Sequence, residues 1–169
     1  SSNVNSANAV DAQATYESQM SIWANILGGA NVVYHAAGWM EGGLQTNLEK
    51  LVIDADMLQM MVEVLKPISI DDDALGLKAI EEVGVGGHFF GTTHTIERYE
   101  NAFYRPIISD WRNYESWEEA GKPTAEQHAN RVWKQLLTEY EPPQLPSDRR
   151  EALDEFVMRR KMEMGEQRW

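Results

Sequence analysis

The sequence has no cysteine, which excludes disulfide bonds, thiolate metal sites and a cysteine nucleophile. It has no apolar run near the roughly 20 residues that a membrane-spanning helix needs, and no stretch resembles a signal peptide. Positive charge is scarce, because 15 Lys and Arg stand against 27 Asp and Glu, for a formal net charge of −12. Nucleic acids and anionic membranes both favour clustered Lys and Arg. We therefore expect neither as a partner, and we expect a cytoplasmic protein.

The length and apolar content are sufficient for a packed core. The chain has 169 residues, 43% of them apolar, and includes six Trp, six Tyr and four Phe, which argues against disorder. A chain near 150 residues buries roughly 70% of its unfolded surface. We therefore expect a folded chain with a sizeable core.

Helical periodicity recurs along most of the chain. Thr46 with Glu49, and Thr124 with Gln127, have the spacing of capping boxes that begin helices. Apolar spacing together with start and stop signals predicts helices over residues 10–27, 46–65, 71–83, 93–104, 110–120, 124–140 and 147–164.

Two short stretches interrupt the helical pattern. Residues 31–37 form a β-branched run that predicts a buried strand, and residues 84–91 predict either a short strand or a tight glycine turn. Alternating strands and helices are typical of parallel sheets joined by crossovers. However, two or three strands leave sheet edges unpaired, and a closed eight-stranded barrel takes about 250 residues. We therefore predict one end of a larger α/β domain, which on its own self-associates or exposes apolar surface.

Polar and aromatic residues in glycine-rich loops or at predicted strand ends are candidate binding groups. Trp39 and Glu41 follow the first predicted strand. Trp39 either packs one end of a barrel, or it provides a ring face that holds an ammonium group beside the Glu41 carboxylate. Asn3 and Asn5 would follow a strand whose body lies before Ser1, and they would then point to the face where α/β barrels have their sites.

His88 and Phe90 lie in the second glycine-rich stretch. This stretch is either a strand flanked by turns that need positive φ, or a strand end that opens into a site with both residues in its wall. His88 and His94 are six residues apart and share no helix face, and no thiolate or clear carboxylate completes a ligand set. We predict no metal site.

Several motifs together resemble the trimethylamine methyltransferase family of corrinoid-dependent enzymes. They are VDAQATYE (10–17), GGHF (86–89), YESW (114–117) followed by Ala120-Gly121, and LLTEYEP (136–142). These motifs follow the family's order over nearly the whole chain. The resemblance implies an α/β fold, namely the C-terminal part of a TIM (β/α)8 barrel that is helix-rich and carries a C-terminal helical extension. Residues 1–105 would be the last strand–helix units, and residues 106–169 the extension.

The resemblance also implies an activity. Family members move a methyl group from trimethylamine or a quaternary amine, such as glycine betaine, to the Co(I) centre of a corrinoid. The cobalamin (corrinoid) is carried by a separate partner protein, so we expect no directly bound cofactor, and we expect a homo-oligomer. This chain alone would be an inactive fragment.

Pyrrolysine separates two alternatives within the family. Members that use trimethylamine carry this residue about two thirds along their chain, and none occurs here. Either Ser1 lies at or just after that position, or the protein lacks pyrrolysine and favours a quaternary amine.

The residues assigned to substrate binding are chosen from their place at predicted strand ends. Amide donors are expected from Asn3 and Asn5, ring walls from Trp39 and Phe90, and polar contacts from Glu41 and His88. No catalytic group is identified. The alternative from another functional class is a non-catalytic helical binding or oligomerisation module.

Overall fold

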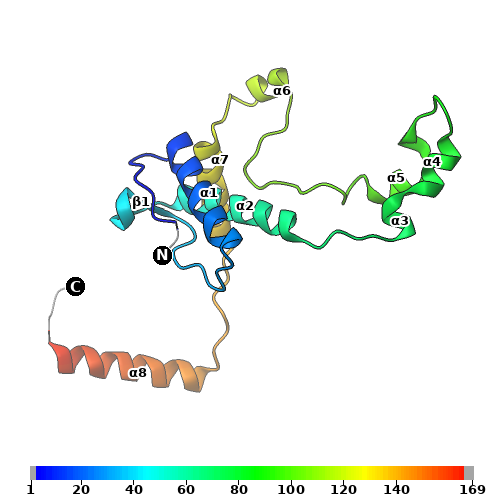
Figure 1. The fold of residues 1–169 in the computed structure, drawn as a ribbon. Helices are drawn as coiled ribbons and strands as arrows, with labels where there is room; N and C mark the ends of the chain where they lie inside the picture. The colour runs from blue at the N-terminus through cyan, green and yellow to red at the C-terminus, as the bar shows by residue number, and fades with distance from the viewer. Residues whose placement is uncertain (1–2, 166–169) are drawn as a thin grey trace. The chain divides into compact units, whose positions relative to one another are not determined.

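The computed structural model describes residues 3–165, and its contacts divide the chain into two units, residues 1–135 and 136–169. Figure 1 labels most of the elements. They are α1 (Ala12–Leu27), β1 (Trp39–Met40), the 3-10 helix η1 (Glu41–Gly43), β2 (Gln45–Thr46), α2 (Leu48–Leu65), α3 (Asp72–Leu75), α4 (Leu77–Val83), the 3-10 helix η2 (Phe89–Gly91), α5 (Thr93–Arg98), α6 (Tyr114–Glu119), α7 (Ala125–Glu139) and α8 (Ser147–Met164). The boundary predicted after residue 105 is of another kind, since it divides the last barrel units from the helical extension, and it stays a prediction.

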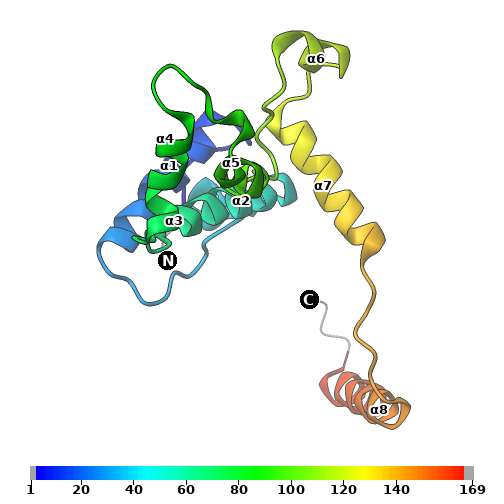
Figure 2. The ribbon, with the colours of Figure 1, turned by 90° about the vertical axis from the view of Figure 1, so that its right-hand side faces the viewer.

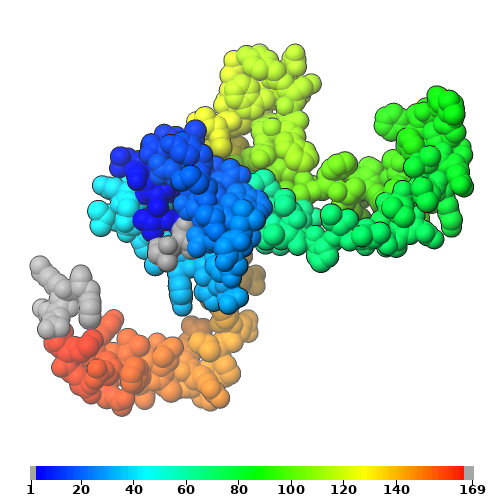
Figure 3. Space-filling model, viewed as in Figure 1, coloured from blue at the N-terminus to red at the C-terminus, as the bar shows by residue number. Residues whose placement is uncertain are grey.

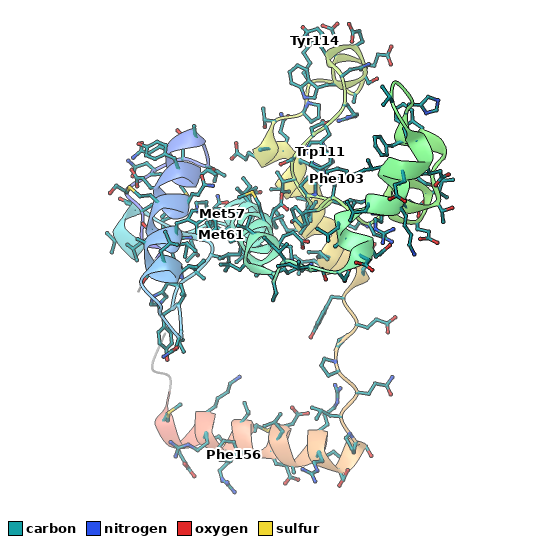
Figure 4. The ribbon with its side chains drawn as sticks, turned by 45° about the vertical axis from the view of Figure 1, so that its right-hand side comes forward. Met57, Met61, Phe103, Trp111, Tyr114 and Phe156 are labelled. Carbon is teal, nitrogen blue, oxygen red and sulfur yellow. The ribbon has the colours of Figure 1, made fainter. Side chains whose placement is uncertain are left out.

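Helices α1 and α2 form the centre of the first unit, where they cross each other (Figure 2). Ile22 of α1 packs with Met57 and Met61 of α2 in a buried cluster (Figure 4). Helix α1 begins after Asp11, whose carboxylate accepts a hydrogen bond from the Ala14 amide at 3.2 Å. Both helices confirm the sequence prediction to within two residues.

The predicted capping box of the second helix is wrong. The N-cap is Asn47, whose side-chain oxygen accepts from the Lys50 amide at 2.9 Å. Thr46 belongs to β2 instead, and the side chain of Glu49 bonds to residues of α7. Asn caps a helix as well as Thr does, so the competing cap one residue later is favoured.

The strand predicted over residues 31–37 is wrong, because this segment forms turns and irregular loop. Among the described residues the sheet consists of two short antiparallel strands, with Trp39 of β1 opposite Thr46 of β2. Residues 84–91 form a glycine turn followed by η2, which is the second of the two predicted alternatives. A β-branched run becomes a strand only when a partner strand takes up its backbone hydrogen bonds. A TIM barrel would need strands beyond these two, so the barrel stays a prediction.

Three other predicted helices are shorter than expected, and the one over 110–120 spans only Tyr114–Glu119. The helix over 71–83 divides into α3 and α4 at Gly76, whose φ of 63° lies in the left-handed region. The helix over 93–104 ends at Arg98. At Gly76 a glycine therefore ends a helix that the apolar period alone would continue.

Helix α7 confirms the second capping box. The Gln127 amide donates to Thr124 Oγ1 at 3.2 Å, and the Thr124 amide donates to Gln127 Oε1 at 3.0 Å. Ala129 of α7 then packs in a buried cluster with Val52 of α2 and Ile108. This cluster joins α7 to α2 through the intervening segment.

The apolar surface that the sequence predicts is present in the structure. Leu51 of α2 is 44% exposed, and Leu48, Val62 and Leu65 of the same helix are exposed as well. Charged residues are buried on the same helix, namely Lys50, Asp54 and Asp56. Helix α2 therefore exposes several apolar side chains to solvent while it buries three ionic ones.

The second unit consists mainly of α8. Its large apolar side chains are exposed, including Phe156, which is labelled in Figure 4. Arg160 forms an ion pair with Glu163 at 2.6 Å on the surface of this helix.

Candidate functional site

Five buried polar residues form what we call the Asp54 cluster, which consists of Asn3, Asn5, Ser18, Lys50 and Asp54. Lys50 forms an ion pair with Asp54 one helical turn away on α2, and its Nζ donates to Ser18 Oγ of α1 at 2.7 Å. Asn3 Nδ2 donates to Asp54 Oδ2 at 3.2 Å, and Asn5 Nδ2 donates to Ser18 Oγ at 3.0 Å. The cluster thus ties Asn3 and Asn5 to both central helices. Figure 3 shows the dark blue segment beside α1.

The same side chains hold the backbone of residues 36–39. The Gly38 amide donates to Asp54 Oδ2 at 2.9 Å, while Asn3 Nδ2 donates to the Ala36 carbonyl at 2.7 Å. Asn5 Nδ2 also donates to the Trp39 carbonyl, at 3.1 Å. Three backbone groups of this loop are therefore fixed by buried side chains.

Gly38 meets two requirements of this loop. Its φ of 83° lies in the region that favours glycine, and a Cβ there would be 3.3 Å from Leu51 Cβ. The loop therefore approaches α2 more closely than a larger residue would permit.

Burial dominates the electrostatics of the Lys50–Asp54 pair. It raises the pKa of Asp54, against the opposing effects of Lys50, the Gly38 amide and Asn3. Burial also lowers the pKa of Lys50, against the opposing effect of Asp54. Because both side chains are fully buried, each charge depends on the other to offset the cost of leaving water.

Asn3, Asn5, Trp39 and Glu41 lie in one part of the first unit, with the two amides inside the protein. Trp39 is half-buried, and its ring lies edge-on to the His35 ring with 5.1 Å between centroids. Glu41 is exposed, and its amide donates to the Ala7 carbonyl at 3.1 Å. The accessible groups of this site are therefore the Trp39 and His35 rings and the Glu41 carboxylate.

His88 and Phe90 belong to a different part of the first unit, between α4 and α5. Their rings pack against each other with 5.7 Å between centroids, and Phe90 is 84% exposed. The structure thus groups the six predicted residues into one set of four and one separate pair.

Sequence reasoning missed Ser18, Lys50 and Asp54. Lys50 and Asp54 are four residues apart on a helix, a spacing that typically belongs to a solvated surface pair. The available signal was their position among apolar residues such as Leu51 and Val52. Only tertiary packing distinguishes the buried case from the exposed one.

A cavity of about 490 Å³ is a second candidate site. It lies between α1, α2, residues 104–111 and the start of α7, and its wall includes Met57, Met60, Trp111 and His128. Asp110 is also in the wall, and its hydrogen bond with Arg112 lowers its pKa to about 2. Apolar walls with a few polar groups are typical of small-molecule pockets.

Asp56 holds one wall of this cavity in place by hydrogen bonds. Its Oδ1 accepts from the Tyr104 hydroxyl at 2.5 Å and from the Ile107 amide at 2.9 Å, and its Oδ2 accepts from the Ile108 amide at 3.0 Å. Burial and the Asp56 charge raise the pKa of Tyr104 to about 12. Tyr104 therefore remains a hydrogen-bond donor throughout the neutral range.

Glu49 links α2 to α7 and makes this contact dependent on pH. Its Oε1 accepts from Asn130 Nδ2 at 2.6 Å and from Trp133 Nε1 at 2.8 Å, and these bonds hold its pKa below the usual value. Because the pKa is lower in the folded state, the stabilisation is fully present above about pH 4.5, the pKa of an ordinary glutamate. It is lost as the pH falls through the folded-state pKa.

Replacing Glu49 with glutamine is expected to remove this acid sensitivity. Urea unfolding at about pH 7 and about pH 4 measures it, since the wild type loses an extra share of its stability between these values. Glu126→Gln is the matched control, because Glu126 lies exposed in the first turn of α7 and should keep the wild-type dependence. An equal acid loss in Glu49→Gln and the wild type would contradict the assignment.

Residues 3–165 contain no group of three His, Asp or Glu side chains that could hold a metal ion. Over the same residues, no helix is both long and apolar enough to span a membrane.

Comparison with known proteins decides the family. The trimethylamine methyltransferase family (MTTB) matches residues 1–165. The chain belongs to this family. The resemblance that the sequence motifs predict is therefore confirmed.

Three curated methyltransferases are similar in sequence to this chain. It is 35% identical to a glycine betaine methyltransferase of Desulfitobacterium hafniense (strain Y51), over 97% of this chain and 34% of the relative. It is 29% identical to trimethylamine methyltransferase MttB2 of Methanosarcina mazei, over 82% of this chain and 28% of the relative. It is 28% identical to trimethylamine methyltransferase MttB of Desulfitobacterium hafniense (strain DSM 10664 / DCB-2), over 92% and 31%. The chain spans about a third of the length of the curated relatives it matches.

Proposed function

We propose that the whole protein containing these residues moves a methyl group from a methylated amine to the cobalt of a corrinoid held by a partner protein. The family match over residues 1–165 carries this proposal. The reduced cobalt of the partner would supply the nucleophile that takes the methyl group. The residues of this chain would bind the amine, orient it and exclude water.

A quaternary amine such as glycine betaine is the substrate class that we favour. The glycine betaine methyltransferase matches 97% of this chain at 35% identity, whereas MttB2 matches 82% at 29%. Ring faces and a carboxylate suit a cationic ammonium group, and the exposed part of the site offers Trp39, His35 and Glu41. When the N–CH3 bond of a quaternary ammonium breaks, the electron pair stays on nitrogen and a neutral amine leaves, so no proton donor is required.

The fold proposal is the C-terminal part of a TIM barrel, with residues 1–105 as its last strand–helix units and residues 106–169 as a helical extension. The exposed apolar side chains on α1 and α2 support it, because helices that cover a barrel need such a surface to pack on the rest of the domain. A cytoplasmic location and a homo-oligomeric assembly belong to the same proposal.

A non-catalytic binding or oligomerisation module is the second candidate function. The exposed apolar residues of α8, including Leu153, Phe156 and Val157, favour it. Such a module would bind through these side chains and would give no methyl transfer in the whole protein.

The test is a methyl-transfer assay of the full-length protein that contains residues 1–169. Glycine betaine, trimethylamine and dimethylamine are each supplied with a Co(I) corrinoid partner protein, and the loss of Co(I) absorbance is followed. We expect turnover with glycine betaine. If none of the methylated amines reacts while the same partner accepts methyl groups from a known family enzyme, the binding-module function is favoured.

Two tryptophan variants locate the amine. Trp39→Leu is expected to raise KM about tenfold through loss of a ring face, while Trp111→Leu, in the wall of the cavity, should leave KM unchanged. The opposite result would assign the amine to the cavity and contradict the site at residues 35–41.

A further inference from the structure

Asp54 holds the loop of residues 36–39 both directly and through Asn3. Asp54 Oδ2 accepts from the Gly38 amide at 2.9 Å, and the same oxygen accepts from Asn3 Nδ2 at 3.2 Å. Asn3 in turn donates to the Ala36 carbonyl at 2.7 Å. One carboxylate oxygen therefore holds the loop at Gly38 directly and at Ala36 through Asn3.

The cluster itself is out of reach of a ligand. Asn3, Asn5, Ser18, Lys50 and Asp54 are between 0% and 3% exposed. Any effect of Asp54 on a bound amine must therefore pass through the loop, which carries Trp39 directly after Gly38. A polar group at this depth needs partners that offset its desolvation, and Lys50 provides the opposite charge.

We infer that Asp54 is a positioning residue, which fixes the loop of residues 36–39 so that the Trp39 ring is held against the substrate. The inference rests on the proposed function, because it takes Trp39 as a wall of the amine site. Lys50 forms an ion pair with the fully buried Asp54, and Ser18 accepts a hydrogen bond from Lys50 Nζ. In this arrangement the ion pair holds the Asp54 carboxylate in place, and the hydrogen bond from the Gly38 amide to that carboxylate fixes the loop.

Two double variants of the full-length protein separate the hydrogen bond from the charge. Both carry Lys50→Met, so neither leaves a buried ammonium without a partner. Asp54→Asn keeps an oxygen that can accept from the Gly38 amide, whereas Asp54→Leu has similar size and no acceptor. The comparison therefore removes the hydrogen bonds that position 54 makes with Gly38 and Asn3, and it holds the loss of both charges constant.

The expected result is a difference in kinetics and in the environment of Trp39. K50M/D54N should keep kcat/KM for glycine betaine within about threefold of the wild type, and K50M/D54L should lose about tenfold or more, since small misplacements of a binding group are costly. With 5-fluorotryptophan incorporated, the 19F resonance of Trp39, assigned with Trp39→Phe, should shift in K50M/D54L and stay in place in K50M/D54N. The spectrum reports on the loop independently of activity.

The outcomes distinguish this inference from the proposed function. An inactive wild type contradicts the function and leaves the 19F comparison as the measure of the loop. An active wild type with equal kcat/KM and equal Trp39 resonances in the two variants overturns the positioning role. If K50M/D54L does not fold, K50M/D54A removes the same acceptor without the added bulk, and the same two readouts apply.

Discussion

Replacing Lys50 with methionine alone is expected to lower the free energy of unfolding by about 3–5 kcal/mol, the usual cost of leaving one buried charge without its partner. Asp54 is fully buried, and burial raises its pKa even with Lys50 present. Without the ammonium group, the carboxylate either stays ionised at high cost or takes up a proton. Urea unfolding monitored by circular dichroism measures the change.

Adding Asp54→Asn to Lys50→Met should restore most of the lost free energy of unfolding. K50M/D54N has no buried charge, and replacing both members of such a pair is often close to neutral. The surface pair Lys66–Glu63 provides the control, because its side chains are 59% and 38% exposed and Lys66→Met should cost at most about 1 kcal/mol. A loss in Lys50→Met no larger than in Lys66→Met would show that the pair is not held inside the protein.

Replacing Asp56 with alanine is expected to cost about 3 kcal/mol, because three donors lose one charged acceptor and two of them are backbone amides. Residues 104–108 should then detach from α2, and the cavity beneath them should open. Chemical unfolding gives the energy, and limited proteolysis of this segment gives the location.

Two controls bracket the Asp56 result. Tyr104→Phe removes one donor and leaves both amide bonds, so it should cost about 1 kcal/mol. Asp73→Ala removes an aspartate whose side chain is 68% exposed in an ion pair with Arg98, and it should change stability by at most about 1 kcal/mol. If Asp56→Ala is no more costly than Tyr104→Phe, the amide bonds to Asp56 do not hold the segment.

The helices could be predicted from the sequence where local signals agree. In α7, the apolar period and the reciprocal Thr124–Gln127 cap point to the same start, and the structure confirms both. The helix over 71–83 fails at Gly76, where a left-handed φ outweighs the continuing apolar pattern. Local patterns thus specify an element when its start, its face and its end all agree.

The strand at 31–37 could not be predicted reliably, because a strand is a property of a pair of segments. Val32 and Val33 have suitable side chains, but the carbonyl of Ala36 accepts from Asn3 rather than from a second strand. Trp39 and Met40, which the sequence places in a loop, do form a short pair with Gln45 and Thr46.

The site was predictable in part for a similar reason. Asn3, Asn5 and Trp39 are chosen as polar or aromatic residues at predicted strand ends, and the structure brings them together. Asp54 has no such local mark, since its partners Asn3 and Gly38 are 51 and 16 residues away. A residue defined by distant partners becomes visible only once the chain is folded.

Three carboxylates on α2 have a consequence for how the first unit comes apart. Asp54 holds Asn3 and the loop at Gly38, Asp56 holds residues 104–108, and Glu49 holds α7. If α2 frays, all of these attachments are lost together, and if any one of them opens, a carboxylate is left without its donors. Helix α2 therefore couples to itself residues as far as 84 positions away in the sequence, and its own amides should be among the slowest of the unit to exchange with solvent deuterium.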